Sequence, residues 1–252
     1  MTPRGEHFLE SLERGMAVLA CFDAAHPTRT LTEVAGATGL TKATARRILL
    51  TLADLGYVRL DGRSFTLAPR VLDFGFSYLA NLGTAGAEPV MRELSVELGQ
   101  SVLLAVLDGT DVRYVARANA PRTLHLNIPV GERSPAQVTS SGRLLVASLP
   151  DADRERWLST VELVAFTRHS VSDVDVLRDE LTRTRQQHWA HSASELDVGM
   201  EGVAVLVPGS PVATALSVVF PATRYTAEDQ VTEVVPLLTR YASRIAEATR
   251  TP

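Results

Sequence analysis

The sequence predicts an α+β protein with an N-terminal winged helix-turn-helix, a linker helix, and a C-terminal domain in which helices flank an antiparallel sheet. Three observations support this prediction. A chain of 252 residues is long for one small domain, so we expect two. Near the N-terminus, helix-spaced apolar residues lead into an Asp-Gly turn between two extended runs. Strand-like and helix-like segments then mix, which favours helices packed on an antiparallel sheet.

The predicted N-terminal domain begins with two helices. Residues 6–22 form the first helix, whose apolar face comprises Phe8, Leu12, Met16, Leu19 and Ala20. Residues 23–29 interrupt it. Thr30 and Glu33 have the spacing of a capping box, which opens a short helix through Leu31, Val34 and Ala35. Gly39 and Leu40 then form a tight turn.

A third helix and a hairpin complete this domain. Thr41 can cap the helix, whose buried stripe comprises Ala45, Ile48, Leu49, Leu52 and Leu55. Gly56 ends it, because glycine adopts the left-handed cap conformation without a steric cost. Two extended runs, 57–60 and 64–67, flank Asp61-Gly62-Arg63, which is a strong hairpin signal. This order of elements is that of a winged helix-turn-helix.

The start of the third helix predicts contact with double-stranded DNA. A recognition helix enters the major groove with its N-terminal residues facing the bases. Arginine and lysine can reach guanine edges or phosphates there, and threonine can reach phosphates or methyl groups. An arginine at the hairpin tip can contact a phosphate or the minor groove. The predicted DNA-binding residues are therefore Thr41, Lys42, Ala43, Thr44, Arg46, Arg47 and Arg63.

The remainder of the chain predicts a linker and a larger domain. Pro69 can occupy the first turn of a linker helix that the glycine-containing run over 81–86 interrupts. We expect a DNA-binding domain over 1–68, a linker over 69–83 and a second domain over 84–252. The predicted helices of the second domain cover 88–98, 141–148, 151–159, 174–188 and 228–248. The predicted strands cover 101–107, 112–118, 123–128, 203–207 and 213–220.

Composition and charge limit the possible functions. Hydrophobic residues make up 45% of the chain and charged residues 21%, which is typical of a soluble protein with packed cores. The start resembles neither a signal nor a transit peptide, and the chain has no run of about 20 apolar residues. We therefore expect a cytoplasmic protein with no membrane partner. The net charge of −4 argues against indiscriminate coating of nucleic acid, although residues 40–72 carry a local excess of basic groups.

Sequence motifs give no support for catalysis or metal binding. The chain has none of the nucleophile-elbow, zinc-protease, dinucleotide or phosphate-loop motifs. His188 and His191 are three residues apart, but no third ligand follows at a useful distance. Cys21 lies in an apolar run, so a packed thiol is expected. We predict no catalytic residue, no metal and no cofactor.

Several motifs resemble the IclR family of transcription regulators. They are Ser-Leu-Glu-Arg-Gly from residue 11, Thr-Lys-Ala-Thr-Ala-Arg-Arg from residue 41, Ser-Ser-Gly-Arg from residue 140, and Glu-Leu-Asp-Val-Gly-Met-Glu-Gly-Val-Ala from residue 195. The first two are most similar to the Pca/Pob branch, which controls aromatic-acid catabolism. The resemblance implies a GAF-like effector domain and homodimers that can pair into tetramers. It also implies effector contacts at Leu126, Ser140, Ser141, Ser192, Met200, Gly202 and Ser217.

Two further features bear on the implied effector site. Val219 and Phe220 stand where relatives carry small or hydroxyl residues, which implies a bulkier and more apolar pocket end. Thr139, Ser140 and Ser141 precede an apolar helix, and a helix N-terminus favours an anionic ligand. Serines at such a position can instead serve only as caps. Arg117, Arg133 and Arg143 are candidates to neutralise a ligand carboxylate.

These features lead to one hypothesis and three alternatives. The hypothesis is that a small organic acid, aromatic or derived from an aromatic ring, binds the C-terminal domain and changes how the dimer fits its operator. One alternative is an enzyme, which the missing motifs disfavour. Another is a DNA-binding protein that needs no ligand. The third is a protein-interaction adaptor with a degenerate wing, for which no salt-dependent DNA binding is expected.

Overall fold

The computed structural model describes residues 5, 7–120 and 128–250. Internal contacts divide the chain into two units, Met1–Tyr78 and Leu79–Pro252. The predicted linker helix is present as a 3-10 turn, Pro69–Val71, followed by helix α4, Leu72–Asn81. The division between the units falls inside α4, and the domain limits at residues 68 and 83 stay a prediction.

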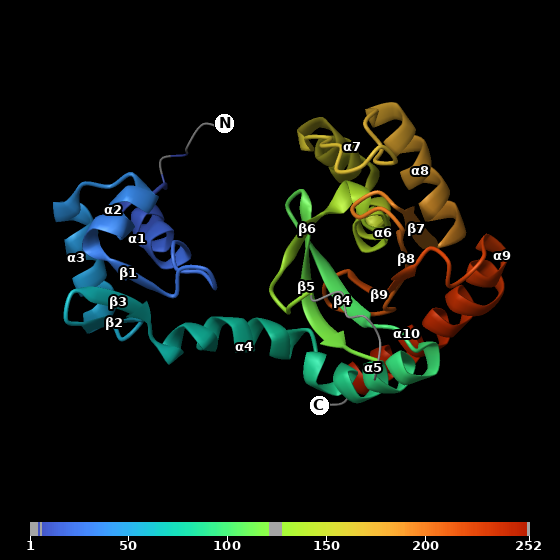
Figure 1. Ribbon diagram of the computed structural model, residues 1–252, viewed down its shortest axis with the longest axis horizontal. Coiled ribbons are helices and arrows are strands. Elements are labelled where there is room, and N and C mark those ends of the chain that lie inside the picture. The colour runs from blue at the N-terminus through green and yellow to red at the C-terminus, as the bar shows by residue number, and fades with distance from the viewer. Residues whose placement is uncertain (1–4, 6, 121–127, 251–252) are drawn as a thin grey trace. The chain divides into compact units, whose positions relative to one another are not determined.

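The N-terminal unit packs three helices against a small antiparallel sheet (Figure 1). The helices are α1, Glu10–Ala20, α2, Leu31–Thr38, and α3, Lys42–Asp54; the strands are β1, Thr28–Thr30, β2, Val58–Asp61, and β3, Ser64–Leu67, in the order β1-β3-β2. The capping box is confirmed, since the Thr30 amide donates to the Glu33 carboxylate at 2.6 Å. The predicted hairpin is also confirmed. Strand β1 was missed because its Thr-Arg-Thr sequence shows no apolar alternation.

The predicted apolar face of the first helix packs against the core only at its C-terminal end. Leu12 and Met16 are 62% and 58% exposed, whereas Val18 is fully buried. The helix begins at Glu10, and the small core of this unit takes up only its C-terminal end. In α3, the predicted stripe is confirmed at Ala45, Leu49 and Leu52. Leu55 is exposed, because the helix has ended at Asp54 and the chain turns away.

The C-terminal unit is built on a six-stranded antiparallel sheet in the order β6-β5-β4-β9-β8-β7. The predicted antiparallel sheet flanked by helices is therefore confirmed. The strands are β4, Val102–Asp108, β5, Asp111–Ala118, β6, Arg133–Pro135, β7, Trp189–Ala193, β8, Met200–Leu206, and β9, Thr214–Pro221. The strand predicted over 123–128 lies outside the described residues except for Ile128, and β6 was not predicted.

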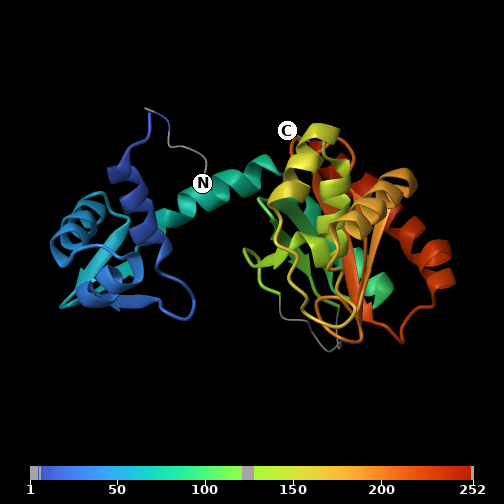
Figure 2. The same ribbon diagram turned by 90° about the horizontal axis from the view of Figure 1, so that it is seen from above.

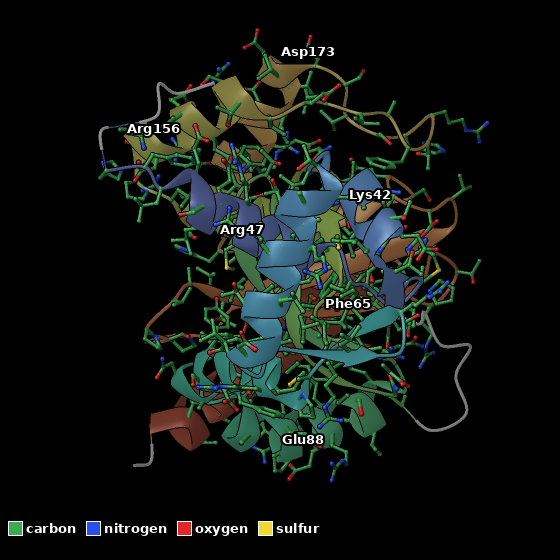
Figure 3. The ribbon with its side chains drawn as sticks, turned by 90° about the vertical axis from the view of Figure 1, so that its left-hand side faces the viewer. Lys42, Arg47, Phe65, Glu88, Arg156 and Asp173 are labelled. Carbon is green, nitrogen blue, oxygen red and sulfur yellow. The ribbon has the colours of Figure 1, made fainter. Side chains whose placement is uncertain are left out.

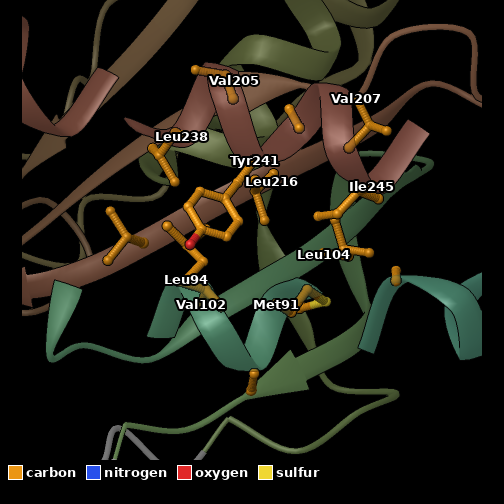
Figure 4. Packing of buried hydrophobic residues seen from close by; sticks show 14 of the residues in the cluster. Met91, Leu94, Val102, Leu104, Val205, Val207, Leu216, Leu238, Tyr241 and Ile245 are labelled. Atoms are coloured by element: carbon orange, nitrogen blue, oxygen red, sulfur yellow. The ribbon is translucent and has the colours of Figure 1, made fainter. Parts of the chain in front are cut away.

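Helices cover both faces of this sheet (Figures 1 and 2). One face carries α5, Thr84–Leu98, and α10, Val235–Arg250. Their apolar side chains, among them Met91, Leu94, Leu238 and Ile245, pack against the sheet in one buried cluster (Figure 4). The other face carries α6, Ser140–Ser148, α7, Asp151–Thr160, and α8, Val174–Gln187. The three helices predicted here are confirmed within one or two residues.

The closing helix is less regular than the sequence predicts. It starts with α9, Ala227–Asp229, passes through a π-helical turn, Gln230–Val234, and continues as α10. Gln230 is buried, and its amide donates to the Glu201 carboxylate on β8 at 2.7 Å. The π turn thus joins the helix to the sheet.

The first turn of α6 approaches the preceding backbone very closely, which generates a prediction. A Cβ at Gly142 would lie 2.6 Å from the carbonyl carbon of Ala136, which is itself fully buried. We expect Gly142→Ala to lower the free energy of unfolding of the C-terminal unit by about 1 to 3 kcal/mol, as overpacking does. Denaturant titration measures this.

Gly36 provides the matched control. It is exposed within α2, and a Cβ there would meet nothing within 4 Å. Gly36→Ala should raise the stability of its own unit by up to about 1 kcal/mol, the helix propensity difference. Equal stability of wild type and Gly142→Ala would contradict the close packing of α6.

Candidate functional site

The recognition helix α3 is fixed by the two threonines at its start. The Thr41 hydroxyl accepts a hydrogen bond from the Thr44 amide at 3.2 Å, as the sequence predicts. The two threonine hydroxyls also share a hydrogen bond of 2.9 Å. Because this bond uses one of their two hydrogens, one hydroxyl hydrogen remains available to an outside acceptor.

The basic side chains of α3 lie opposite its buried stripe. Lys42, Arg46 and Arg47 are exposed, and Figure 3 shows Lys42 and Arg47 on this helix. Lys42 and Arg46 share a face because they are four residues apart, as do Ala43 and Arg47. Within the part of the chain that the structure describes, none of these three basic groups forms a hydrogen bond or ion pair. Their charges are therefore available to an external anion.

The predicted DNA-binding residues divide between two sides of α3. Arg46 and Arg63 line one surface hollow, which the start of α2 and the hairpin complete. Thr44 and Arg47 line a second hollow, between α1 and α3. Arg63 follows Gly62 at the hairpin tip and is exposed. The structure thus brings helix and wing arginines to one concave surface.

A second site lies in the C-terminal unit, where residues far apart in sequence meet through strand register. Ser192 on β7 pairs with Gly202 on β8, and Gly202 pairs with Val219 on β9. Ser217 faces the same side as Val219, since side chains alternate along a strand. Together with Met200, these residues line a cavity of about 60 Å³, which has room for several water molecules.

The N-terminal end of α6 closes this cavity. Thr139 caps the helix by accepting a hydrogen bond from the Gly142 amide at 3.1 Å. Ser140, Ser141 and Ser217 are 3%, 2% and 1% exposed, and all three line the cavity. Their hydroxyls have no hydrogen-bond partner among the described residues. The predicted capping role therefore belongs to Thr139, and these serine hydroxyls remain available to a ligand.

Gly202 lets two of the hydroxyls come together. A Cβ at this position would lie 2.8 Å from Ser140 Oγ and 3.2 Å from Ser192 Oγ. Both hydroxyls consequently occupy the space above the glycine, although one comes from α6 and the other from β7. Leu126, which the family resemblance implies as an effector contact, lies outside the described residues.

The cavity also contains residues that were not among the predicted effector contacts. They are Tyr114, Ile128, Val138, Thr139, Glu195, Leu196, Asp197 and Glu201. Burial raises the pKa of the Tyr114 phenol, so this group stays protonated and can donate a hydrogen bond. Its position on β5, on the same face as the cavity, could have been inferred only from a correct strand register.

Some predicted features of the pocket are wrong. Phe220 lies on the opposite face of the sheet, in the core formed by α5 and α10, so of this pair Val219 alone lines the cavity. Arg133 forms ion pairs with Asp108 and Asp111. Arg117 donates to Asn119 and to the carbonyl of Ile128. Arg143 pairs with two carboxylates. None of the three arginines lines the cavity.

The described residues were also compared with what a metal site and a membrane-spanning helix require. Across the described residues, no group of three or more His, Cys, Asp or Glu side chains is placed to hold a metal ion. His191 instead forms a 3.0 Å contact with Glu201. No described helix has the length and apolar character needed to cross a membrane.

Comparisons with known proteins identify the family. Residues 11–62 match the IclR helix-turn-helix domain, and residues 78–247 match the bacterial transcriptional regulator IclR C-terminal domain. The Pca operon regulatory protein of Acinetobacter baylyi is 34% identical over 96% of this chain and 90% of its own. A protein of Rhodococcus sp. RHA1 with a solved crystal structure is 37% identical to this chain in sequence, with a TM-score of 0.80. The match covers 96% of this chain and 98% of the Rhodococcus chain.

A third similarity involves the C-terminal unit. The inducer-binding domain of Acinetobacter PobR, solved as a double mutant with 3-hydroxybenzoic acid, is 25% identical with a TM-score of 0.58. It covers 64% of this chain and 95% of that domain. The resemblance to the Pca/Pob branch that the motifs predict is confirmed by these matches. The chain belongs to the IclR family of bacterial transcriptional regulators.

Proposed function

We propose that this regulator binds an operator in double-stranded DNA through α3 and the hairpin wing, and that a small organic acid in the C-terminal cavity controls it. The observation that carries the ligand proposal is the set of buried serine hydroxyls around the cavity. Ser140, Ser141 and Ser217 are almost fully buried without a described partner. Because these serines line the cavity, their hydroxyls are available as donors to a polar ligand.

The cavity has the chemistry to receive an aromatic acid. The N-terminus of α6 favours a carboxylate, because its first amide groups have no partner within the helix and the helix dipole is positive there. Tyr114 can donate to a further oxygen. Ile128, Val138 and Val219 supply apolar surface for a ring. The bound 3-hydroxybenzoic acid of the PobR domain supports the same ligand class for this chain.

Regulation requires that the acid distinguish two states of the assembly. We propose a homodimer, which can pair into a dimer of dimers, with two recognition helices that read two operator half-sites. Leu12 and Met16 on α1 and Phe74 and Phe76 on α4 are exposed apolar side chains that a second copy could cover. Only an acid that binds one state more tightly can shift operator binding. Because the DNA partner lies in the cytoplasm, we place the protein there.

A second candidate function is DNA binding without a ligand. The free basic groups on α3 support DNA binding equally in this case, and the cavity would then hold only water. The adaptor alternative is disfavoured by the same free charges. We propose no catalytic role, since the Pca operon regulatory protein and PobR are both transcription regulators.

The recognition helix gives a first test. Arg46→Ala should weaken specific operator binding by about 1 to 3 kcal/mol if Arg46 reads a base. Quantitative gel shifts on DNA upstream of the gene, at several salt concentrations, measure this loss. Arg183→Ala is the matched control, because Arg183 is an exposed arginine on α8 whose side chain forms no hydrogen bond or ion pair with another described residue. Unchanged affinity for Arg46→Ala would remove this residue from the site, and salt-independent binding would favour the adaptor.

The cavity gives a second test. Titration with 4-hydroxybenzoate, 3-hydroxybenzoate, 3,4-dihydroxybenzoate and a ketoadipate-like acid should raise the melting temperature and change operator affinity for at least one acid. Gly202→Ala should abolish both effects, because its methyl group would displace the Ser140 and Ser192 hydroxyls. The variant should still fold, since the displaced atoms are side-chain ends. If no acid changes either quantity, ligand-independent DNA binding is the better function.

A further inference from the structure

Behind the effector cavity lies a buried arginine that joins its two walls. Arg143 on α6 is 4% exposed. Its guanidinium donates to the Gln137 carbonyl at 2.9 Å, to the His191 carbonyl at 3.4 Å, and to the Glu195 carboxylate. The Glu195 side chain is 7% exposed, so this ion pair is almost fully removed from solvent.

The groups that Arg143 holds belong to two different segments, and each segment carries cavity residues. Gln137 lies directly before Val138, Thr139 and Ser140 on one wall. His191 and Glu195 flank Ser192 on the other wall. One planar guanidinium therefore spans both segments through main-chain and side-chain acceptors. Arginine suits this task because its donors are held in a rigid fork.

The loop that carries Glu195 is held from a second direction. The Ser170 hydroxyl donates to the Glu195 carbonyl at 2.6 Å, and the Thr167 hydroxyl donates to the Ser194 carbonyl at 2.7 Å. These bonds fix the loop backbone, whereas the link from the loop to α6 runs through the Glu195 carboxylate and Arg143. The Glu195 carboxylate also accepts a hydrogen bond from the Val171 amide at 3.4 Å. Removing its charge should therefore loosen the loop from α6, while Arg143 can still reach the His191 carbonyl on β7.

We propose that Arg143 and Glu195 are positioning residues for effector binding. They hold the segments that place the Ser140 and Ser192 hydroxyls next to Gly202, where both serines line the cavity. This inference rests on the proposed function. A buried ion pair is frequently no more stabilising than a well-packed apolar pair, so fixed geometry is a better reason for it here than stability. Ligand-binding groups gain affinity when supporting residues fix them in place.

The chain contains a natural control for this proposal. Glu180 on α8 is a second carboxylate next to Arg143, with Oε2 2.8 Å from Nη1. The Glu180 Oε2 atom forms no hydrogen bond with a described residue, and Glu180 does not line the effector cavity. Glu180→Gln and Glu195→Gln thus remove the same charge from the same arginine, but only the second variant affects a wall of the cavity.

The experiment compares these two variants of the full chain. Calorimetric titration with 4-hydroxybenzoate should show affinity about tenfold or more weaker for Glu195→Gln, as occurs when metal ligands lose their supporting partners. Glu180→Gln should bind within about twofold of wild type. Hydrogen exchange should be faster over 137–143 and 191–196 in Glu195→Gln and unchanged there in Glu180→Gln. Equal effects of the two variants, or none, would overturn the proposal.

Two further outcomes distinguish failure of the proposed ligand function from failure of the positioning role of Arg143 and Glu195. If wild type binds none of the acids named above, the proposed ligand function fails, and the exchange comparison alone decides whether the pair positions the walls. If Glu195→Gln does not fold, the Arg143→Met/Glu195→Met pair replaces both charges with apolar groups of similar size. Wild-type exchange over 191–196 in that double variant would overturn the proposal.

Discussion

The close approach of the first turn of α6 to its surroundings determines the ligand site. Two glycines permit it: Gly142 packs against the Ala136 backbone, and Gly202 leaves space on β8 beneath Ser140. The helix N-terminus can therefore lie directly over the sheet. Ser140, Ser141 and Ser217 are buried here, and all three line the cavity. A methyl group at Gly142 would meet the Ala136 backbone, and one at Gly202 would displace the Ser140 and Ser192 hydroxyls.

The two units carry their functional groups in opposite ways. In the N-terminal unit, Lys42, Arg46 and Arg47 are exposed charges on one helix, which suits long-range attraction to phosphates. In the C-terminal unit, neutral hydroxyls and helix amides line a cavity that also contains Glu195, Asp197 and Glu201, while the charge of Arg143 is committed to Glu195 and Glu180. DNA binding can thus tolerate a mobile side chain, whereas effector binding depends on fixed geometry.

The sequence predicted local structure well and long-range structure poorly. The Thr30 and Thr41 caps, the Asp-Gly hairpin and helices α6 to α8 depend on neighbouring residues, and all were correct. The exposure of Leu12 and Met16 on α1 could not be predicted, because periodicity identifies an apolar stripe and not what covers it. The roles of Arg143 and Tyr114 could not be predicted, because each depends on strand register or on contacts 48 to 52 residues away. The family resemblance identified Ser140, Ser141, Ser192 and Ser217, and the structure places all four around one cavity.

The claim that neutral donors above Gly202 receive the carboxylate of an organic acid is tested most directly by a crystal structure with 4-hydroxybenzoate bound. We predict that a ligand carboxylate oxygen lies within hydrogen-bond distance of the Ser140 and Ser192 hydroxyls, with Arg143 still paired to Glu195. A carboxylate paired with Arg143 in place of Glu195, or an acid bound outside this cavity, would contradict it.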